Sequence, residues 1–158
     1  MTGQPLIQVL DKTLKLHKSL HQLALKKTTI IKEGDISRLN ELMKEELKHV
    51  SAIQMLEGKR SGLACTITGK KESTLTECLP FLPQGEQKEL KLLQGKMEEV
   101  LSGLKEQNQL NQQLIEQSMQ YVSMNLHLLM PQAESQSYSS QGQEQSADHI
   151  KPIFNSKA

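Results

Sequence analysis

A chain of 158 residues is long enough for one domain, or for one domain and a tail, and its 19 Lys and Arg nearly balance 18 Asp and Glu. The net charge of +1 gives no general attraction to nucleic acid, and 3% aromatic residues with no Trp argue against a β-sandwich or an α/β enzyme core. The abundant Leu, Met, Lys, Glu and Gln are good helix formers, so the composition predicts an all-α protein of long helices.

Two features of the sequence indicate the cellular compartment of the protein. No stretch of about 20 consecutive apolar residues is present, so we expect no membrane insertion. The stretch from Met1 to Leu10 lacks the basic flank and unbroken apolar run of a secretory signal, which favours a cytoplasmic protein. In that compartment Cys65 and Cys78 are expected to be reduced thiols, whereas an exported protein would favour a disulfide between them.

The first periodic segment predicts a helix from about Pro5 to Glu33. Prolines break helix interiors, and all five prolines fall outside the strongly periodic stretches. The pair Gly34-Asp35 then ends this helix and starts another, because glycine accepts the left-handed conformation and aspartate caps a helix N-terminus. Such a short connection predicts an antiparallel hairpin. The apolar stripe of the first helix consists of Leu6, Val9, Leu10, Thr13, Leu14, Leu16, Leu20, Leu23, Ala24 and Ile30.

The second predicted helix runs from about Ile36 to Arg60 and is followed by a connector from Gly62 to Gly85. Within the connector, Thr74 and Glu77 have the spacing of a capping box, which predicts a short helical turn. The Phe81-Leu82 pair is expected to plug the open end of a helical bundle. The apolar positions through which the second helix is predicted to pack on the first are Ile36, Leu39, Leu42, Met43, Leu47, Val50, Ile53 and Leu56.

The third predicted helix runs from about Glu86 to Met130 and completes a bundle domain of residues 1–130. Residues 131–158 are dominated by Ser and Gln, so we predict a disordered tail. The predicted fold class is all-α, with an antiparallel helical hairpin and one long third helix in an elongated three-helix bundle or coiled coil. A heptad pattern places on the seam of the third helix Leu90, Leu93, Met97, Val100, Leu104, Gln107, Asn111, Leu114, Ser118, Tyr121, Asn125 and Leu128.

The sequence offers little for catalysis, and we expect no enzymatic activity, no metal and no cofactor. His17 and His21 have a spacing that lets two rings share a metal, but no third ligand lies nearby. Two partly exposed helix histidines are therefore the favoured interpretation. Cys65 has no CxxC partner and no triad context, and no glycine-rich phosphate loop is present.

The end of the third helix is the most informative part of the sequence. From Gln107 to Met130 the only formally charged residue is Glu116. At 100° per residue, the apolar side chains of this stretch cover an arc of about 240°, which is wider than one packed hairpin covers. We interpret the surplus as a docking surface for a helix of another protein, with methionines as adaptable contacts. Deeper packing within the bundle and a homodimer are the alternatives.

Two stretches resemble the FlgN family of flagellar export chaperones. The first is LALKKTTIIKEGDISRLNELMKEELKHVSAIQMLEGKRSGL, with its Gly34-Asp35 break, the Leu39 and Leu42 entry to the second helix, and Leu56-Glu57 before Arg60. The second is LKEQNQLNQQLIEQSMQYV, which resembles the Asn- and Leu-rich last helix of the family through Asn108, Leu110, Asn111, Leu114 and Tyr121.

The resemblance covers about Leu6 to Met130 and implies a cytosolic, non-enzymatic chaperone with an antiparallel helical bundle. Members of the family hold the hook–filament junction proteins, which are the first and third hook-associated proteins. They bind C-terminal helical segments of these clients and deliver them to the flagellar type III export gate. The family's binding role maps onto the last helix, where the expected client-binding residues are Leu110, Leu114, Ile115, Met119, Tyr121, Val122 and Leu126.

Two further interpretations stay open at this point. The short cluster from His149 to Phe154 is a recognition motif for the export machinery, a cover for the apolar arc, or part of an inert tail. The alternative function is a self-associating coiled coil with no client, since the heptads of the third helix permit a homodimer.

Overall fold

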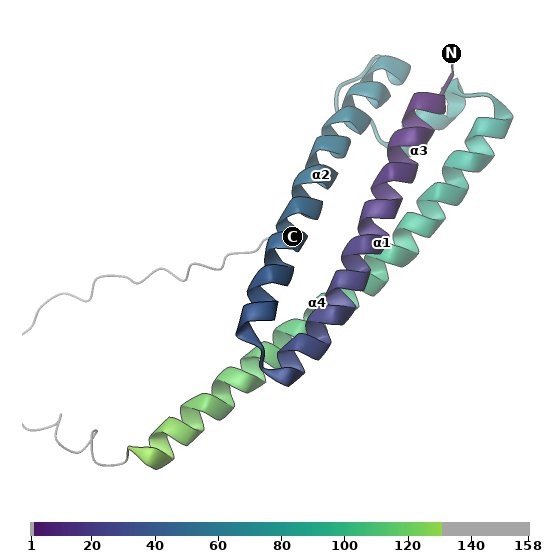
Figure 1. Cartoon of the computed structure of the whole chain (residues 1–158). Helices are drawn as coiled ribbons and strands as arrows, with labels where there is room; N and C mark the ends of the chain where they lie inside the picture. The colour runs from purple at the N-terminus through teal and green to yellow at the C-terminus, as the bar shows by residue number, and fades with distance from the viewer. Residues whose placement is uncertain (1, 131–158) are drawn as a thin grey trace, which may run out of the picture. The chain divides into compact units, whose positions relative to one another are not determined.

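The structure is a computed structural model that describes residues 2–130. The described residues contain helices and no strand, which confirms the all-α prediction. The predicted disordered tail, 131–158, lies outside the described residues, and so does the cluster from His149 to Phe154. In chain order the elements are α1 (Gln4–Glu33), α2 (Ile36–Thr68), α3 (Leu75–Cys78), the short 3-10 helix η1 (Leu79–Phe81) and α4 (Gln84–Leu129) (Figure 1).

The chain divides into two units, Met1–Gln120 and Tyr121–Ala158. The hairpin, the connector and the buried core described below all belong to the first unit. The predicted division into a bundle domain of residues 1–130 and a tail of residues 131–158 stays a prediction.

The turn between α1 and α2 is built from local chemistry. Gly34 has a φ of +71°, and its N–H donates to the carbonyls of Ile30 and Ile31 at 3.1 and 3.2 Å. The carboxylate of Asp35 accepts a hydrogen bond from the N–H of Arg38 at 3.0 Å and thereby caps α2. The turn predicted from Gly34-Asp35 is confirmed.

Polar contacts join α1 and α2 along the hairpin. Lys27 Nζ lies 3.1 Å from Glu46 Oε2, and both side chains are largely buried. Farther from the turn, Ser19 Oγ lies 2.8 Å from His49 Nε2. Residue numbers fall along α1 as they rise along α2, so the two helices are antiparallel, as predicted (Figure 1).

The second helix is longer than the sequence pattern indicates. α2 continues to Thr68 instead of ending near Arg60, and Gly62 lies inside it rather than at the start of a connector. Ala64 and Ile67 are buried, so packing of this last part of α2 outweighs the cost of about 1 kcal/mol for a glycine in a helix interior. Gly69, with a φ of +72°, ends the helix.

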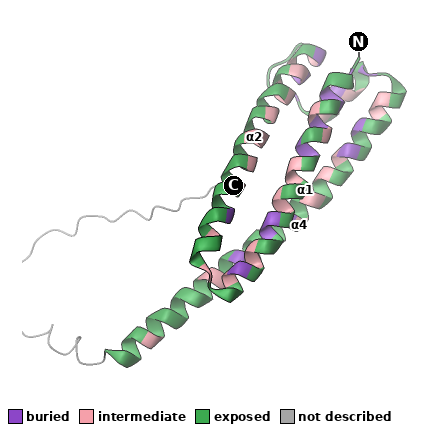
Figure 2. Cartoon of the chain, viewed as in Figure 1, coloured by how far each residue is buried: buried purple, intermediate pink, exposed green. Residues whose placement is uncertain are grey.

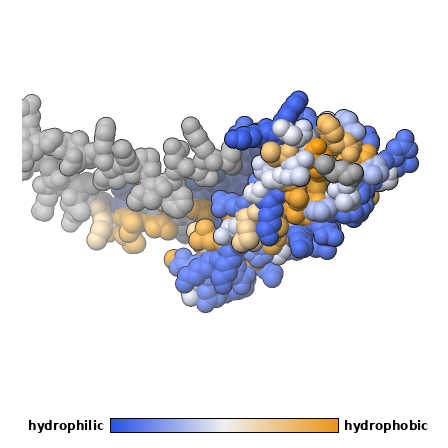
Figure 3. Space-filling model, turned by 90° about the horizontal axis from the view of Figure 1, so that it is seen from above, coloured by the Kyte–Doolittle hydropathy of each residue, from blue (hydrophilic) through white to orange (hydrophobic). Residues whose placement is uncertain are grey.

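The connector closes one end of the bundle. Thr74 and Glu77 form the predicted capping box at the start of α3, because the Thr74 hydroxyl accepts from the Glu77 N–H and the Glu77 carboxylate accepts from the Thr74 N–H. Cys78 and Leu82 are buried, whereas Phe81 is 54% exposed. The prediction that Phe81 plugs the bundle is therefore wrong, and Leu82 has that role. Figure 3 looks onto this end, where hydrophobic surface lies between hydrophilic side chains.

α4 runs parallel to α1 in a fixed register within the first unit. At one end, the Gly3 N–H donates to Glu86 Oε2 at 2.7 Å, across a sequence separation of 83. At the other end, the Thr28 hydroxyl donates to Asn111 Oδ1, again across a separation of 83. The separation is the same at both contacts, so the two helices keep one register over nearly the whole of α1.

The buried residues, which Figure 2 marks in purple along the ribbon, include two hydrophobic clusters in the first unit. The smaller cluster joins α1 and α2 near the hairpin turn through Leu23, Ile30 and Leu42. The larger cluster joins α1, α2, α3 and α4 toward the other end, and its members are Leu6, Ile7, Leu10, Leu14, Ala64, Ile67, Cys78, Leu82, Leu90 and Leu93.

Burial corrects the predicted packing of α2. Leu42 is the one member of its predicted apolar set that is fully buried, while Leu39, Ile53 and Leu56 are half-buried. A helical period identifies an apolar face but does not say whether a neighbouring helix covers it. The remaining four predicted packing positions are exposed, namely Ile36, Met43, Leu47 and Val50.

The predicted seam of α4 is buried only in its first part. Leu90, Leu93, Leu104 and Asn111 are buried, and Met97, Val100, Gln107 and Leu114 are half-buried. The later seam positions Ser118, Tyr121 and Leu128 are exposed, and Asn125 is half-buried. The heptad pattern therefore continues past the point where the side chains are covered.

We expect Leu90→Ala to lower the free energy of unfolding by about 2–5 kcal/mol, because Leu90 is fully buried and its truncation leaves a cavity. Urea unfolding followed by circular dichroism measures the effect. Leu92→Ala is the matched control on the same helix, where the side chain is 60% exposed, and its effect should stay within about 0.5 kcal/mol. Equal effects of the two variants would contradict the core described above.

The contact between Gly3 and Glu86 predicts a pH dependence of stability. The hydrogen bond from the Gly3 N–H, with a further one from the Thr2 hydroxyl, lowers the pKa of Glu86 below its ordinary value. A lowered folded-state pKa stabilises the fold above the unfolded pKa of about 4.3, and this contribution is lost as the pH falls through the folded-state pKa.

We therefore expect Glu86→Gln to lower the Tm near neutral pH, and the difference from wild type to shrink in acid. Thermal unfolding at a series of pH values measures it. Glu89→Gln is the control, because Glu89 is exposed on the same helix and makes no hydrogen bond or ion pair with the described residues. A constant difference between wild type and Glu86→Gln at all pH values would show that the charge of Glu86 is not what stabilises this contact.

Candidate functional site

The predicted client-binding residues of the first unit lie at the end of its part of α4. Leu110 and Met119 are exposed, at 42% and 67%, and Leu114 and Ile115 are half-buried. The partial burial follows from helical geometry, because Leu114 and Ile115 lie on either side of the line through Leu104 and Asn111 that faces α1. Part of each of these two side chains therefore supports the bundle and part stays accessible.

A polar layer orients α4 at this point. Asn111 is buried, its Nδ2 donates to the Ala24 carbonyl at 2.9 Å, and its Oδ1 accepts from the Thr28 hydroxyl. The Gln107 side chain donates to the same hydroxyl. Buried polar groups that are all paired favour one register, because any shift leaves them without partners. The layer thus fixes which face of α4 is turned away from α1.

The register also shows which residue of α4 lies opposite the end of α1. Glu33 is the last residue of α1, and the sequence separation of 83 places Glu116 of α4 opposite it. Glu116 is also the last formally charged residue among the described residues of α4. The residues between Glu116 and the end of the first unit at Gln120 have no counterpart on α1, and Ser118 and Met119 are exposed. The charged residues of α4 and its pairing with α1 therefore end at the same residue.

The terminal segment, defined here as residues 121–130, belongs to the second unit. It contains no Lys, Arg, Asp or Glu, and Asn125 is its one half-buried residue. Every apolar side chain of the segment is exposed, by 55% at Val122 up to 79% at Leu129. Contiguous exposed apolar residues of this kind mark interaction sites more often than ordinary surface. The apolar side chains are Tyr121, Val122, Met124, Leu126, Leu128, Leu129 and Met130.

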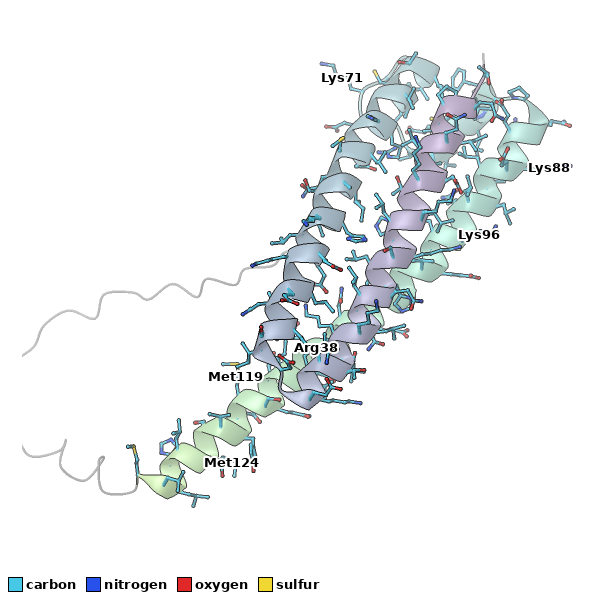
Figure 4. All side chains as sticks on the ribbon, in the orientation of Figure 1. Arg38, Lys71, Lys88, Lys96, Met119 and Met124 are labelled. Carbon is cyan, nitrogen blue, oxygen red and sulfur yellow. The ribbon has the colours of Figure 1, made fainter. Side chains whose placement is uncertain are left out.

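Methionines are prominent among these exposed residues. Met119 of the first unit and Met124 of the terminal segment project from α4 as unbranched side chains (Figure 4), and Met124 is 65% exposed. The flexible thioether of methionine adapts its shape to different apolar partners. This chemistry suits the binding of several related helices.

Within residues 2–130 no group of three His, Cys, Asp or Glu side chains is placed to hold a metal ion. His17 Nδ1 donates to the Thr13 carbonyl at 2.9 Å, and the ring of His21 lies against Gly103. Burial raises the pKa of the Cys78 thiol, which keeps it protonated and unreactive, and Cys65 is a half-buried free thiol.

The sequence interpretation located the apolar end of α4, but it missed a second exposed apolar surface on α2, formed by Ile36, Met43, Leu47 and Val50. The regular spacing of these residues is the sequence signal for this surface, but the same spacing is also typical of a face that packs on α1. No helix in the described part of the chain has the length and apolar character needed to cross a membrane.

Comparison with known proteins agrees with these features. The FlgN protein family matches residues 1–146. An uncharacterized protein of Bacillus subtilis (strain 168), YvyG, is 29% identical over 140 residues, and the aligned region covers 88% of each chain. No solved structure matches the chain. Because the family match covers far more than half of the sequence, the chain belongs to the FlgN family of flagellar export chaperones, which bind hook-associated proteins.

Proposed function

We propose that this protein is a cytoplasmic chaperone for the hook–filament junction proteins. It binds C-terminal helical segments of the first and third hook-associated proteins, keeps them unassembled, and delivers them to the flagellar type III export gate. Residues 1–130 form the chaperone domain. The binding surface consists of Leu110, Leu114, Ile115, Met119, Tyr121, Val122 and Leu126.

The observation that carries this proposal is the exposed apolar part of α4 beyond Glu116. A helix that is apolar over a wide arc, and uncharged, is stable in water only at a cost, because its large side chains remain hydrated. Covering them with the apolar face of another helix removes that cost. Helical segments with apolar residues at three- and four-residue spacing are the partners that such a surface accepts.

The energetics suit reversible holding of a client. Burying a Leu, Val or Met side chain stabilises a complex by about 1.5–3 kcal/mol, and several such side chains are available on α4. Association itself costs about 4–15 kcal/mol, so the net affinity stays far below the sum of the contacts. A complex of this kind holds a client segment and still releases it when another site competes for the client.

Binding of the chaperone to the C-terminal helix of a client also explains how the client is kept unassembled. Subunits that assemble through C-terminal helices cannot do so while those helices are covered by another protein. The uncharged surface imposes no strict charge pattern on the client, so that two related junction proteins fit the same residues.

Val122→Glu/Leu126→Glu should weaken binding of a junction-protein C-terminal peptide at least about tenfold, because two carboxylates must then be buried without partners. Fluorescence anisotropy with labelled peptides from the first and third hook-associated proteins measures the affinity. Both side chains are exposed, so we expect the variant to keep the helicity and Tm of wild type.

The matched control is Gln120→Glu/Ser123→Glu, which adds the same charge at exposed polar positions of α4. Its affinity should stay within about twofold of wild type. Equal binding by wild type and Val122→Glu/Leu126→Glu refutes the assigned surface. Light scattering over a dilution series tests the alternative of a self-associating coiled coil: a concentration-independent dimer that Val122→Glu/Leu126→Glu dissociates would favour that alternative.

A further inference from the structure

The exposed apolar residues of α2 form one narrow stripe, which we call the α2 stripe and define as Ile36, Met43, Leu47 and Val50. Ile36 and Leu47 are 72% and 69% exposed, and Met43 and Val50 are also exposed. Their spacing of seven, four and three residues places all four side chains within an arc of about 60°. Single exposed apolar residues need no explanation, but a row of four over four turns does.

The α2 stripe is distinct from the side of α2 that packs on α1. Leu42 is buried against Leu23 and Ile30 of α1, and Glu46 forms its ion pair with Lys27 of α1. On a helical wheel these α1-facing positions lie about 70–110° from the middle of the α2 stripe. The stripe therefore faces outward while the hairpin keeps its own core.

The charges at the two edges of the α2 stripe differ. On the α1 side the charge of Glu46 is already matched by Lys27, at 3.1 Å. On the other side Lys44 and Lys48 are exposed, and neither forms an ion pair with a carboxylate of residues 2–130. The aliphatic parts of these lysines extend the apolar surface, and their ammonium groups remain available. A partner on the α2 stripe therefore first meets the positive charge of Lys44 and Lys48 at this edge, while the exposed Glu41 and Glu45 lie farther around the helix.

We propose that the α2 stripe docks a second protein partner through an amphipathic helix that carries Asp or Glu beside its apolar face. The apolar residues of that helix cover Leu47 and its neighbours, and its carboxylates pair with Lys44 and Lys48. This surface differs in chemistry from the terminal segment, which has no charged residue. The chain can thus hold an uncharged helix on α4 and an acidic helix on α2 at separate places.

An antiparallel pairing with a second copy of the chain does not suit the α2 stripe. In an antiparallel, two-fold pairing of α2 with α2, the same edge of each helix meets the same edge of the other. Lys44 and Lys48 would then face Lys44 and Lys48 of the other copy, and like charges at such positions oppose association. The charge pattern therefore favours a different, acidic partner.

The size of the α2 stripe predicts a transient complex. From Ile36 to Val50 it is about 21 Å long, which matches a partner helix of about four turns. Interfaces of that extent lie at the small end of the range for protein complexes and are typical of weak, reversible encounters. Part of the attraction is between exposed charges, so it is expected to weaken as salt is added.

Two synthetic peptides of about four turns test the proposal on the full-length chain. Both have the same leucine face, and one carries glutamates beside it where the other carries lysines. We expect the acidic peptide to bind at least about tenfold more tightly than the basic peptide, and to bind more weakly as salt rises. Lys44→Glu/Lys48→Glu should reverse this preference, and Leu47→Gln should weaken both peptides.

The control for net charge is Lys88→Glu/Lys96→Glu, two exposed lysines on α4 (Figure 4), which should leave the preference as in wild type. Val122→Glu/Leu126→Glu should also keep binding of the acidic peptide, which separates this surface from the client surface on α4. Melting curves verify that each variant is folded.

Three results would overturn the proposal: no binding of the acidic peptide, equal binding of both peptides, or an unchanged preference in Lys44→Glu/Lys48→Glu. A wild-type dimer that Leu47→Gln dissociates would also overturn it, because the α2 stripe would then be covered by a second copy.

Discussion

Two polar contacts far apart along α1 hold this helix against α4 in a single register. At one end the Glu86 carboxylate accepts from the Gly3 N–H, and near the other end the Thr28 hydroxyl donates to Asn111 across the same separation of 83. Apolar side chains alone tolerate small shifts along a helix, whereas these groups lose their partners when the register changes. Within the first unit, this constraint decides which residues of α4 lie beside α1.

The register accounts for the change from covered to exposed residues along α4 within the first unit. Before Glu116, the residues of α4 that face α1 are buried or half-buried, and charged residues occupy its outer positions. From Gln117 to Gln120, the end of the first unit, α1 offers no counterpart, and the described residues after Glu116 carry no formal charge. One helix thus contains a part that stabilises the bundle and a part whose apolar side chains are exposed.

The local features of the fold could be predicted, because each is encoded by neighbouring residues. The hairpin turn depends on a glycine with positive φ and an aspartate cap, and the start of α3 depends on the capping box of Thr74 and Glu77. The end of α2 was less predictable. Glycine disfavours a helix interior, so Gly62 suggests a helix end, but the burial of Ala64 and Ile67 keeps α2 helical beyond it. The buried Ile7 was missed because it lies beside the regular stripe of α1 rather than in it.

The candidate site was only partly predictable for a related reason. Periodicity and charge depletion located the apolar end of α4, but they did not distinguish exposed from half-buried positions, as Leu114 and Ile115 show. The same period on α2 suggested a packed face, and the structure shows that its outer members have no cover. Which faces are covered depends on contacts between distant segments, and a single sequence carries no direct record of them.

The burial of Cys78 has an experimental consequence. Its side chain is fully enclosed and its Sγ donates to the Thr74 carbonyl, while Cys65 is half-buried on the neighbouring helix. A thiol reagent reaches Cys78 only when α3 and the end of the bundle separate. In a variant without Cys65, the rate at which this thiol is labelled reports the opening equilibrium of that end directly, with no added probe.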